Sequence, residues 1–404
     1  MVIFWIFAGL TAFGLISYGL QILAVRSYLR ETERRRRKGI VSPCHCIPLS
    51  ILKPLKGLDD NLFDNLESFC LQDYPQYEII FSLRDHNDPA YKVARKIKEK
   101  YPGKDISLIV ERCSAGLNPK VNNLIPAYQV AKYEFILISD SNVMVGRDYL
   151  REIGKHFGDP DVGLVTNLIR GVGGRTLGSV FENLHLNTFI MGSICFLDRF
   201  LGMPCVVGKS MLMRKEDLLA IGGFRSVKDV LAEDYVMGKK MHKMGKKVLV
   251  SSYFINNVNQ YWGLKKFLNR HTRWGKLRWK IGGIRYFSEL LSNSVFMACF
   301  PLFLYAPSKL TGLFAVMVSC IKVTGDFYIG RKIKAEMNPF LYLLSPVKDL
   351  IIGIIWFIPI ISNTVVWRGN RYVIGKDSKL SPCTEPGLWA WRYRVLNAIK
   401  ARLV

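Results

Sequence analysis

The sequence predicts an α/β domain with a mostly parallel sheet, flanked by transmembrane helices on its N-terminal and C-terminal sides. Long uncharged runs lie near both ends of the chain, and short apolar runs alternate with amphipathic stretches between them. Half of the 404 residues are hydrophobic, which excludes a mainly disordered chain. The 57 Lys and Arg outnumber the 32 Asp and Glu, for a net charge of +25. This combination is typical of a membrane protein with a basic cytosolic face.

The first element is a membrane anchor. Residues 2–25 carry no charged side chain, and a helix of 24 residues can cross a hydrocarbon core of about 30 Å. A basic run at 34–38 follows, and such residues stay in the cytosol. A cleaved signal peptide would carry its basic residues first. We expect an anchor over 1–26, a basic linker over 27–47, and an integral multi-pass membrane protein with its soluble domain on the cytosolic face.

The region from 48 to 286 has the pattern of a soluble α/β domain. Apolar runs that suit buried parallel strands alternate with amphipathic helical stretches. The expected strands are 50–52, 77–83, 106–110, 134–139, 162–166 and 248–252. The expected helices include 59–71, 88–100 and one that begins at Asn118-Pro119. Parallel strands joined by helices place their ligands at the carboxyl ends of the strands.

The region from 287 to 372 is expected to return to the membrane. Residues 290–308, 310–321 and 350–367 are uncharged, and Pro301 and Pro307 interrupt the first run. Lys322 and Asp326 follow the second run, either at the membrane edge or as functional charges inside it. We expect two or three membrane segments here and a basic tail over 373–404, with the number of crossings left open.

Two expected strands end in carboxylates. Asp85 follows the strand at 77–83, and Asp140-Ser141-Asn142 follows the strand at 134–139. A single Asp after a strand is often a turn former or a helix cap. Two such ends on one sheet edge favour a functional crevice, and the oxygens of Asp140 and Asn142 suit Mg²⁺ or Mn²⁺ held together with substrate phosphates.

A third acidic feature, Glu233-Asp234, comes directly before a long basic stretch of the sequence. Glu233-Asp234 are the last acids before residues 235–288, which hold 13 Lys and Arg and no Asp or Glu. Within this stretch Arg270, Arg273 and Trp274 share one face of an expected interfacial helix at 262–281. Guanidinium groups match phosphate oxygens, and an indole can cover a sugar or a lipid chain. The alternative is a basic amphipathic helix that rests on the bilayer.

Seven motifs in order resemble those of the ceramide glucosyltransferases, which are membrane enzymes with a GT-A domain. The motifs are Lys53-Pro-Leu-Lys-Gly57, Asp85-His-Asn-Asp-Pro89, Asn118-Pro-Lys-Val-Asn-Asn-Leu124, Asp140-Ser-Asn142, Leu212-Met-Arg-Lys215, Ala232-Glu-Asp-Tyr235 and Arg270-x-x-Arg-Trp274. The likeness extends from the N-terminal anchor to Trp367-Arg-Gly-Asn-Arg-Tyr372. At 184–202 the chain departs from the acceptor-side pattern of the animal enzymes.

The resemblance implies an enzyme that transfers glucose from UDP-glucose to the primary hydroxyl of ceramide with inversion. Asp234 would be the general base, Asp140 would also hold a divalent metal, Mg²⁺ or Mn²⁺, and Trp274 would contact the acceptor. The residues that the resemblance assigns to the nucleotide-sugar are Lys53, Asp85, Asp140, Asn142, Arg270 and Arg273. The expected partners are the UDP-sugar, a membrane lipid and the bilayer, and no nucleic acid.

Other functions remain open at the level of sequence. The same chemistry on another lipid, such as a hopanoid polyol, fits the motif set. A processive polysaccharide synthase shares the fold but needs more membrane crossings. A different class, a non-catalytic scaffold that binds anionic lipid, fits the charge but leaves Asp85, Asp140 and Asp234 unexplained. The sequence does not distinguish glucose from galactose or N-acetylglucosamine.

Overall fold

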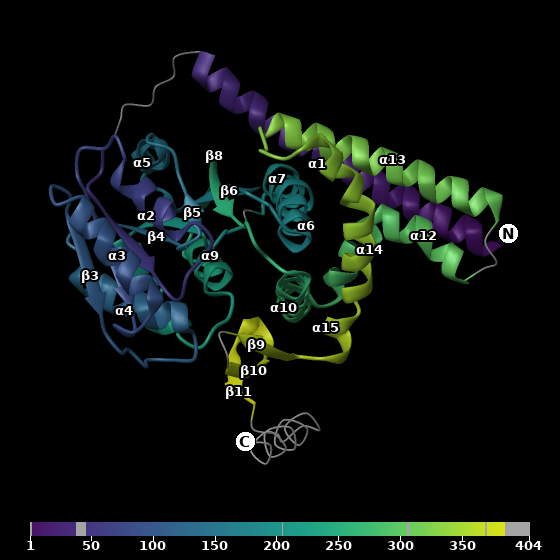
Figure 1. The fold of residues 1–404 in the computed structure, drawn as a ribbon. Coiled ribbons are helices and arrows are strands. Elements are labelled where there is room, and N and C mark those ends of the chain that lie inside the picture. The colour runs from purple at the N-terminus through teal and green to yellow at the C-terminus, as the bar shows by residue number, and fades with distance from the viewer. Residues whose placement is uncertain (1, 38–45, 204, 305–307, 368–369, 384–404) are drawn as a thin grey trace.

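The computed structural model describes residues 2–37, 46–203, 205–304, 308–367 and 370–383. The expected linker and basic tail therefore lie partly outside the described residues, at 38–45 and 384–404. Figure 1 shows an α/β body on one side, long apolar helices on the other, and a group of helices between them.

An eight-stranded sheet forms the α/β body, in the order β3-β2-β1-β4-β7-β6-β8-β5. Its strands are β1 (Leu49–Pro54), β2 (Tyr77–Leu83), β3 (Ile106–Val110), β4 (Phe135–Ser139), β5 (Val143–Met144), β6 (Val162–Val172), β7 (Ser210–Arg214) and β8 (Lys247–Val258). Strands β1 to β4 are parallel, and β6 is parallel to β8. Strand β7 is antiparallel to both β4 and β6, so β4 and β6 point the same way. The six expected strands and the mostly parallel α/β sheet are confirmed, whereas β5 and β7 were not predicted.

Helices on both faces of the sheet follow from local sequence signals. The helices of this part are α2 (Leu62–Cys70), α3 (Pro89–Lys100), α4 (Pro119–Val130), α5 (Tyr149–Gly154), α8 (Lys215–Ala220) and α9 (Glu233–Lys243). Asp88 caps α3 by accepting a hydrogen bond from the Ala90 backbone N–H at 2.9 Å. Asn118 caps α4 through the N–H groups of Lys120 and Val121. These caps, each followed by proline, fix where the two helices begin.

Three helices connect the sheet to the apolar helices. They are α6 (Leu177–His185), α7 (Met191–Leu201) and α10 (Leu264–Gly282), and α6 and α7 are joined by a π-helical turn, η2 (Leu186–Ile190). Helix α10 buries Phe267 and His271. The ring of Phe267 lies 5.7 Å from that of Phe181 on α6. The expected helix at 262–281 therefore forms, and one of its faces packs inside the protein.

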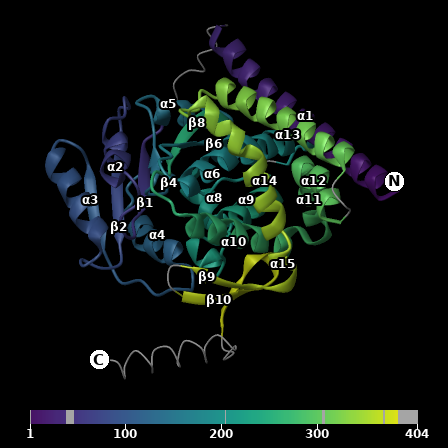
Figure 2. The ribbon, with the colours of Figure 1, turned by 45° about the vertical axis from the view of Figure 1, so that its right-hand side comes forward.

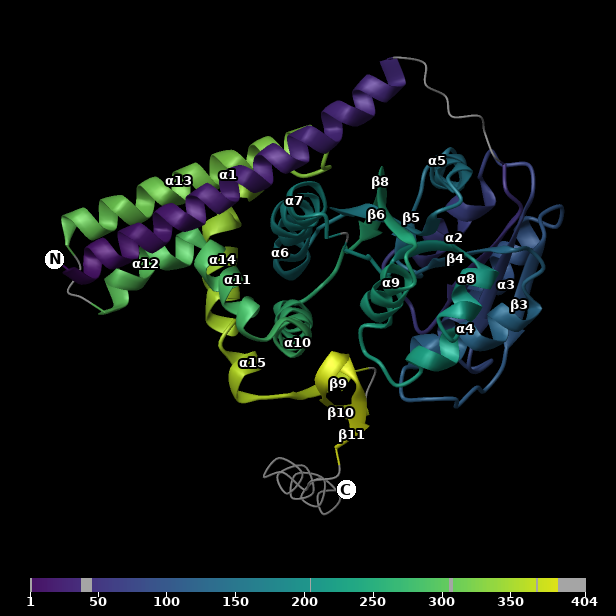
Figure 3. The same ribbon diagram turned by 180° about the vertical axis from the view of Figure 1, so that it is seen from behind.

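Within the described residues, four helical segments are long and apolar enough to cross a membrane. They are Val2–Glu31, Leu177–Leu201, Lys309–Lys332 and Pro339–Ile361. The Leu177–Leu201 segment, largely buried, lies inside the range expected to be soluble. Figures 1 and 3 show α1 (Val2–Arg37) and α13 (Lys309–Lys332) lying side by side, with the N-terminus at the end of α1 farthest from the sheet.

Shorter helices complete the apolar group and lead to a second, small sheet. The helices are η4 (Gly283–Tyr286), α11 (Phe287–Ser292), α12 (Ser294–Leu304), η5 (Pro339–Leu344), α14 (Ser345–Ile355) and α15 (Ile358–Ile361). The small sheet contains β9 (Thr364–Trp367), β10 (Asn370–Ile374) and β11 (Leu380–Pro382), which Figure 2 places in part below α10. The uncharged run at 350–367 thus ends in a strand. The Leu380 N–H donates to the Asp229 carbonyl at 2.7 Å, which ties this sheet to the segment before α9.

Candidate active site

The site lies at the carboxyl ends of the parallel strands, where two lysines converge on Asp140. Asp140 follows β4 directly, and its side chain is 27% exposed. Its carboxylate lies 2.9 Å from the Lys120 Nζ and 3.2 Å from the Lys209 Nζ. These two cations hold the pKa of Asp140 well below its usual value, although burial acts in the opposite direction. Asp140 is therefore ionised across the physiological pH range.

Strand register explains why Lys209 reaches Asp140. Strand β7 runs antiparallel to β4 with Ser210 opposite Ser139, so Lys209, just before β7, lies beside Asp140, just after β4. The Lys209 Nζ also donates to the Asn142 Oδ1 at 2.7 Å. Burial, aided by the positive charge of Arg270, lowers the pKa of Lys209. This lysine was not predicted, because nothing in the sequence pairs residue 209 with residue 140.

Lys120 joins the sheet edge to helix α9. It occupies the first turn of α4, and its Nζ lies 2.9 Å from carboxylate oxygens of both Asp140 and Glu233. It also donates to the Gly208 carbonyl at 2.7 Å. The two carboxylates raise the pKa of Lys120 above its ordinary value against the effect of burial. The sequence motif at 118–124 contained this residue, but only its helix-capping signal was read.

Asp234 lies in the first turn of α9 and is half-buried. Its carboxylate accepts hydrogen bonds from the Gly208 N–H at 2.9 Å and from its neighbouring Tyr235 N–H at 2.8 Å. Burial, followed by the charge of Glu233, raises the pKa of Asp234 to about 6. A side chain at Gly208 would clash, because an added Cβ would lie 2.5 Å from the Asp234 Oδ2. This carboxylate combines access to a substrate with a pKa suited to accepting a proton.

Lys53 lies beneath this edge. Its side chain is fully buried over the ring of Phe69, 3.6 Å from the ring centroid. Its Nζ donates to the Ser139 Oγ at 3.2 Å and to the Asp140 carbonyl at 3.0 Å. Burial lowers the pKa of Lys53 well below its ordinary value. In the structure Lys53 therefore positions the backbone that carries Asp140, and a direct contact with a nucleotide stays a prediction.

Asp85 lies at the same sheet edge but apart from this cluster. Its carboxylate is 44% exposed and 3.8 Å from Arg112, and it accepts a hydrogen bond from the Asn87 N–H at 2.9 Å. Strand β1 separates the end of β2, which carries Asp85, from the end of β4. A ligand that contacts both Asp85 and Asp140 would therefore span the end of β1.

Helix α10 supplies the expected basic and aromatic face. The guanidinium of Arg270 lies over the rings of Trp274 and Trp262, at 4.2 and 5.1 Å from their centroids. Its Nε is 3.4 Å from the carboxylate of Glu182, which is fully buried on α6. Arg273 is half-buried on the next turn of the helix. Glu182 was missed, although an acid inside an apolar stretch is a signal of function.

The chemistry of the two predicted metal donors is compatible with a divalent cation that binds together with a diphosphate. Asp140 and Asn142 offer one carboxylate and one amide oxygen, and Mg²⁺ is commonly held by one or two carboxylates plus substrate phosphates. Both side chains interact with Lys209 instead. Among the described residues, no three His, Cys, Asp or Glu side chains form a metal-binding group. A metal bound through these two oxygens would therefore compete with Lys209, and at Asp140 also with Lys120.

Comparison with known proteins assigns the class and then the family. The model of glycosyl transferase family 21 matches residues 9–380, so the chain belongs to this family and is a glycosyltransferase. Ceramide glucosyltransferase 3 of Caenorhabditis elegans is 28% identical over 346 residues, covering 83% of this chain and 74% of the relative. Ceramide glucosyltransferase of Komagataella phaffii is 31% identical over 204 residues, covering 45% of this chain and 40% of the relative. The resemblance and the expected GT-A fold class are confirmed.

Solved structures with similar folds include two other glycosyltransferases. The mannosyltransferase PcManGT from Pyrobaculum calidifontis, in complex with GDP-Man and Mn²⁺, is 14% identical, with a TM-score of 0.44 and coverage of 87% of this chain and 98% of that chain. TarS 1–349 of S. aureus, in complex with UDP-GlcNAc, is 14% identical, with a TM-score of 0.38 and coverage of 84% of this chain and 100% of that chain.

Replacing Lys209 with methionine should strengthen the binding of Mn²⁺ in the absence of nucleotide. The substitution removes a positive charge in contact with both oxygen donors, so we expect the Kd for Mn²⁺ alone to fall by at least about tenfold. Calorimetry or electron paramagnetic resonance on the purified full chain measures this. Lys100→Met, which removes an exposed ammonium at Glu67, is the matched control. An unchanged Kd in Lys209→Met would contradict competition between Lys209 and the metal.

Proposed function

We propose that this protein transfers glucose from UDP-glucose to the primary hydroxyl of ceramide with inversion at the anomeric carbon. The observation that carries the proposal is the half-buried Asp234 carboxylate, with its raised pKa, next to the Lys120–Asp140–Lys209 cluster. The names of the relatives support the choice of ceramide and glucose. The motif set and the four apolar helical segments found among the described residues support a membrane lipid as acceptor.

The reaction is a single displacement. The acceptor hydroxyl oxygen attacks the anomeric carbon, its proton passes to the Asp234 carboxylate, and the bond from the anomeric carbon to the diphosphate breaks with its electron pair on UDP. Lys209 and Arg270 supply positive charge where the diphosphate becomes more negative. A divalent metal bound through Asp140 and Asn142 would add further neutralisation of the leaving diphosphate.

The surroundings of Glu233 favour a mechanism with one general base, Asp234, over a retaining mechanism in which a carboxylate attacks the sugar. Glu233 is buried, and Lys120 and Asn118 hold its carboxylate at 2.9 and 3.2 Å. It is therefore engaged in the structure and acts on Asp234 mainly through its charge. A retaining mechanism needs a carboxylate free to attack the sugar, and this geometry leaves Asp234 to accept the proton.

We also propose how the chain is arranged relative to the bilayer. The anchor at 1–26, the catalytic domain at 48–286 and the membrane region at 287–372 follow the limits expected from the sequence. The basic residues after the first apolar run support a cytosolic side for the catalytic domain. Asp85 would hold the uridine portion of the donor, and Trp274 would contact the acceptor. The competing proposal is a non-catalytic scaffold that binds anionic lipid. A scaffold would bind membranes and show no turnover.

Asp234→Asn should abolish transfer while the donor still binds. The amide cannot accept the hydroxyl proton, so we expect the transfer rate to fall by a factor of about 10² to 10⁴. Purified full chain in detergent with labelled UDP-glucose, ceramide and Mg²⁺ or Mn²⁺ measures transfer, and equilibrium titration measures UDP-glucose affinity. Asp161→Asn makes the same chemical change at an exposed ion pair with Lys247 and serves as control. Normal turnover by Asp234→Asn would refute its role, and no turnover by the unsubstituted protein would favour the scaffold.

Transfer should also depend on the ionisation of Asp234. Because its pKa is raised to about 6 and the carboxylate is the active form, kcat/KM should fall about tenfold per pH unit as the pH drops below about 6. Glu233→Gln removes the neighbouring charge, so the midpoint should move to lower pH. UDP affinity over the same pH range separates lost binding from lost chemistry. A midpoint near pH 4 in the unsubstituted protein would mean that Asp234 is not the base.

A further inference from the structure

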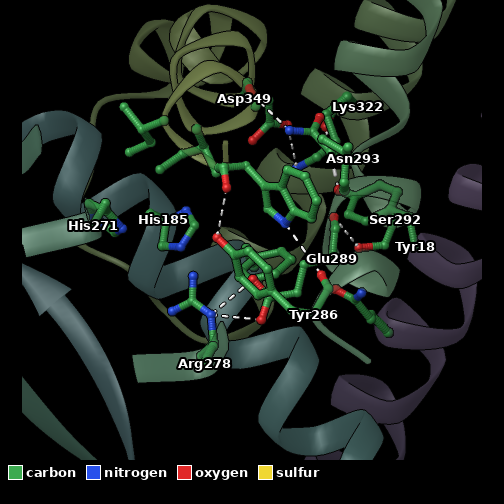
Figure 4. Close-up of a pocket in the computed structure, with 17 residues that line it drawn as sticks. Tyr18, His185, His271, Arg278, Tyr286, Glu289, Ser292, Asn293, Lys322 and Asp349 are labelled. Atoms are coloured by element: carbon green, nitrogen blue, oxygen red, sulfur yellow. Dashed lines mark hydrogen bonds and ion pairs between the residues drawn. The ribbon is translucent and has the colours of Figure 1, made fainter. Parts of the chain in front are cut away.

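A pocket with a mixed polar and apolar lining lies beside α6 and α10, between the sheet domain and the apolar helices. This cavity is partly open, and residues from all four candidate membrane segments line it, together with α10, η4 and α11. Figure 4 shows Tyr18 of α1, Lys322 of α13 and Asp349 of α14 on one side, and His185 and His271 on the other. No residue of the Asp140 cluster lines it.

The charged groups in the cavity wall are paired with one another. The Arg278 guanidinium lies 2.7 Å from Glu289, and Lys322 lies 2.5 Å from Asp326 and 3.5 Å from Asp349. Figure 4 shows the Arg278–Glu289 and Lys322–Asp349 pairs at the wall. Of the charged residues that line the cavity, two are basic and two are acidic. An anionic head group would therefore have to break an existing ion pair, whereas an uncharged polar head would not.

His185 is a buried polar group without a partner. It is 2% exposed, and neither of its ring nitrogens has a hydrogen-bond partner. The rings of Phe189 and His271 hold it in place, with centroids 5.0 and 4.5 Å away. A neutral imidazole offers one N–H donor and one nitrogen acceptor. Buried polar groups normally have hydrogen-bond partners, so a ligand hydroxyl or amide could supply the partner that the His185 ring lacks.

The local backbone around His185 is also irregular. His185 is the last residue of α6, and the π-helical turn η2 begins at the next residue. Phe189, which lines the cavity, belongs to this turn. Single π-helical turns inside helices are frequent at functional sites. The irregularity therefore coincides with the unpartnered histidine.

A chain of contacts leads from this cavity to the donor edge. His271 lines the cavity, and its Nε2 lies 2.9 Å from the Glu182 carboxylate. The other Glu182 oxygen lies 3.4 Å from the Arg270 Nε, and the charge of Arg270 acts on Lys209 at the Asp140 cluster. The cavity wall is therefore connected through Glu182 to the groups proposed to face the diphosphate.

We propose that this cavity binds the uncharged polar head of the acceptor lipid, with His185 hydrogen-bonded to a hydroxyl or amide group. Its hydrocarbon chains would lie among the apolar helices, because those helices supply much of the wall. The inference rests on the proposed function for the identity of the lipid as acceptor. The unpartnered imidazole, the paired charges and the wall of candidate membrane segments support the binding site itself.

Direct lipid binding by the full chain, without nucleotide, tests the proposal. The probe is a short-chain fluorescent ceramide, titrated against purified protein in detergent. We expect His185→Phe, which keeps an aromatic ring and removes both nitrogens, to weaken binding at least tenfold. His185→Gln, which retains a donor and an acceptor, should stay within about threefold of the original affinity. His242→Phe, the same change at an exposed position of α9, is the control and should bind normally.

A second variant and a second readout guard against misfolding. Leu290→Trp fills the cavity from α11 and should weaken probe binding in the same way. UDP affinity should be unchanged in every variant, which shows that each is folded. Unlabelled ceramide should displace the probe, and phosphatidylserine should not. Displacement by phosphatidylserine alone, or unchanged binding in both His185→Phe and Leu290→Trp, would overturn the inference.

The outcomes separate this inference from the proposed function. Glucose transfer together with normal probe binding in His185→Phe would refute lipid binding at the cavity and leave the enzyme assignment intact. Probe binding that depends on His185, in a protein that transfers no sugar, would support the cavity site and refute the proposed function. Absence of probe binding to the unsubstituted protein would overturn the cavity site regardless of activity.

Discussion

The geometry of the site depends on one half-buried ammonium group, that of Lys120. Lys120 lies between Asp140, at the end of β4, and Glu233, at the start of α9, with 2.9 Å to each carboxylate. Glu233 is buried at this junction and needs the cation, since an unpaired buried charge is strongly destabilising. The lysine thus joins the donor edge of the sheet to the helix that presents Asp234. Burial and the charge of Glu233 keep the pKa of Asp234 raised, although Lys120 acts in the opposite direction.

The same junction shows why the sequence predicted some features and not others. Strands β1 to β4 were predictable because each is a short apolar run beside a helix with a clear cap, as at Asp88 and Asn118. Strand β7 was missed because its five residues carry no alternation and its pairing with β4 is antiparallel and distant in sequence. That register alone brings Lys209 to Asp140. In the sequence, Lys120 and Lys209 look like ordinary surface lysines. Only the tertiary structure shows that both contact Asp140.

The membrane-facing half was less predictable for a related reason. An apolar run does not reveal whether it meets lipid or protein. Leu177–Leu201, expected inside the soluble domain, is apolar enough to cross a membrane yet largely buried. The end of the 350–367 run was not expected to form β9. In the structure α6 carries Glu182 to α10, where it contacts both Arg270 and His271. This contact links the sheet domain to the apolar helices. Figures 1 and 3 show α6, α7 and α10 lying between those two parts.

The stereochemistry of the product tests the central claim, that Asp234 acts as the base of a single displacement. The full chain would be incubated with UDP-α-glucose and ceramide, and the anomeric coupling of the glycolipid would be measured by proton NMR before any secondary reaction. The account predicts a β-linked glucoside, since one displacement inverts the α-configuration of the donor. An α-linked product would contradict it, because retention requires a second displacement or a nucleophile that this site, as described, does not provide.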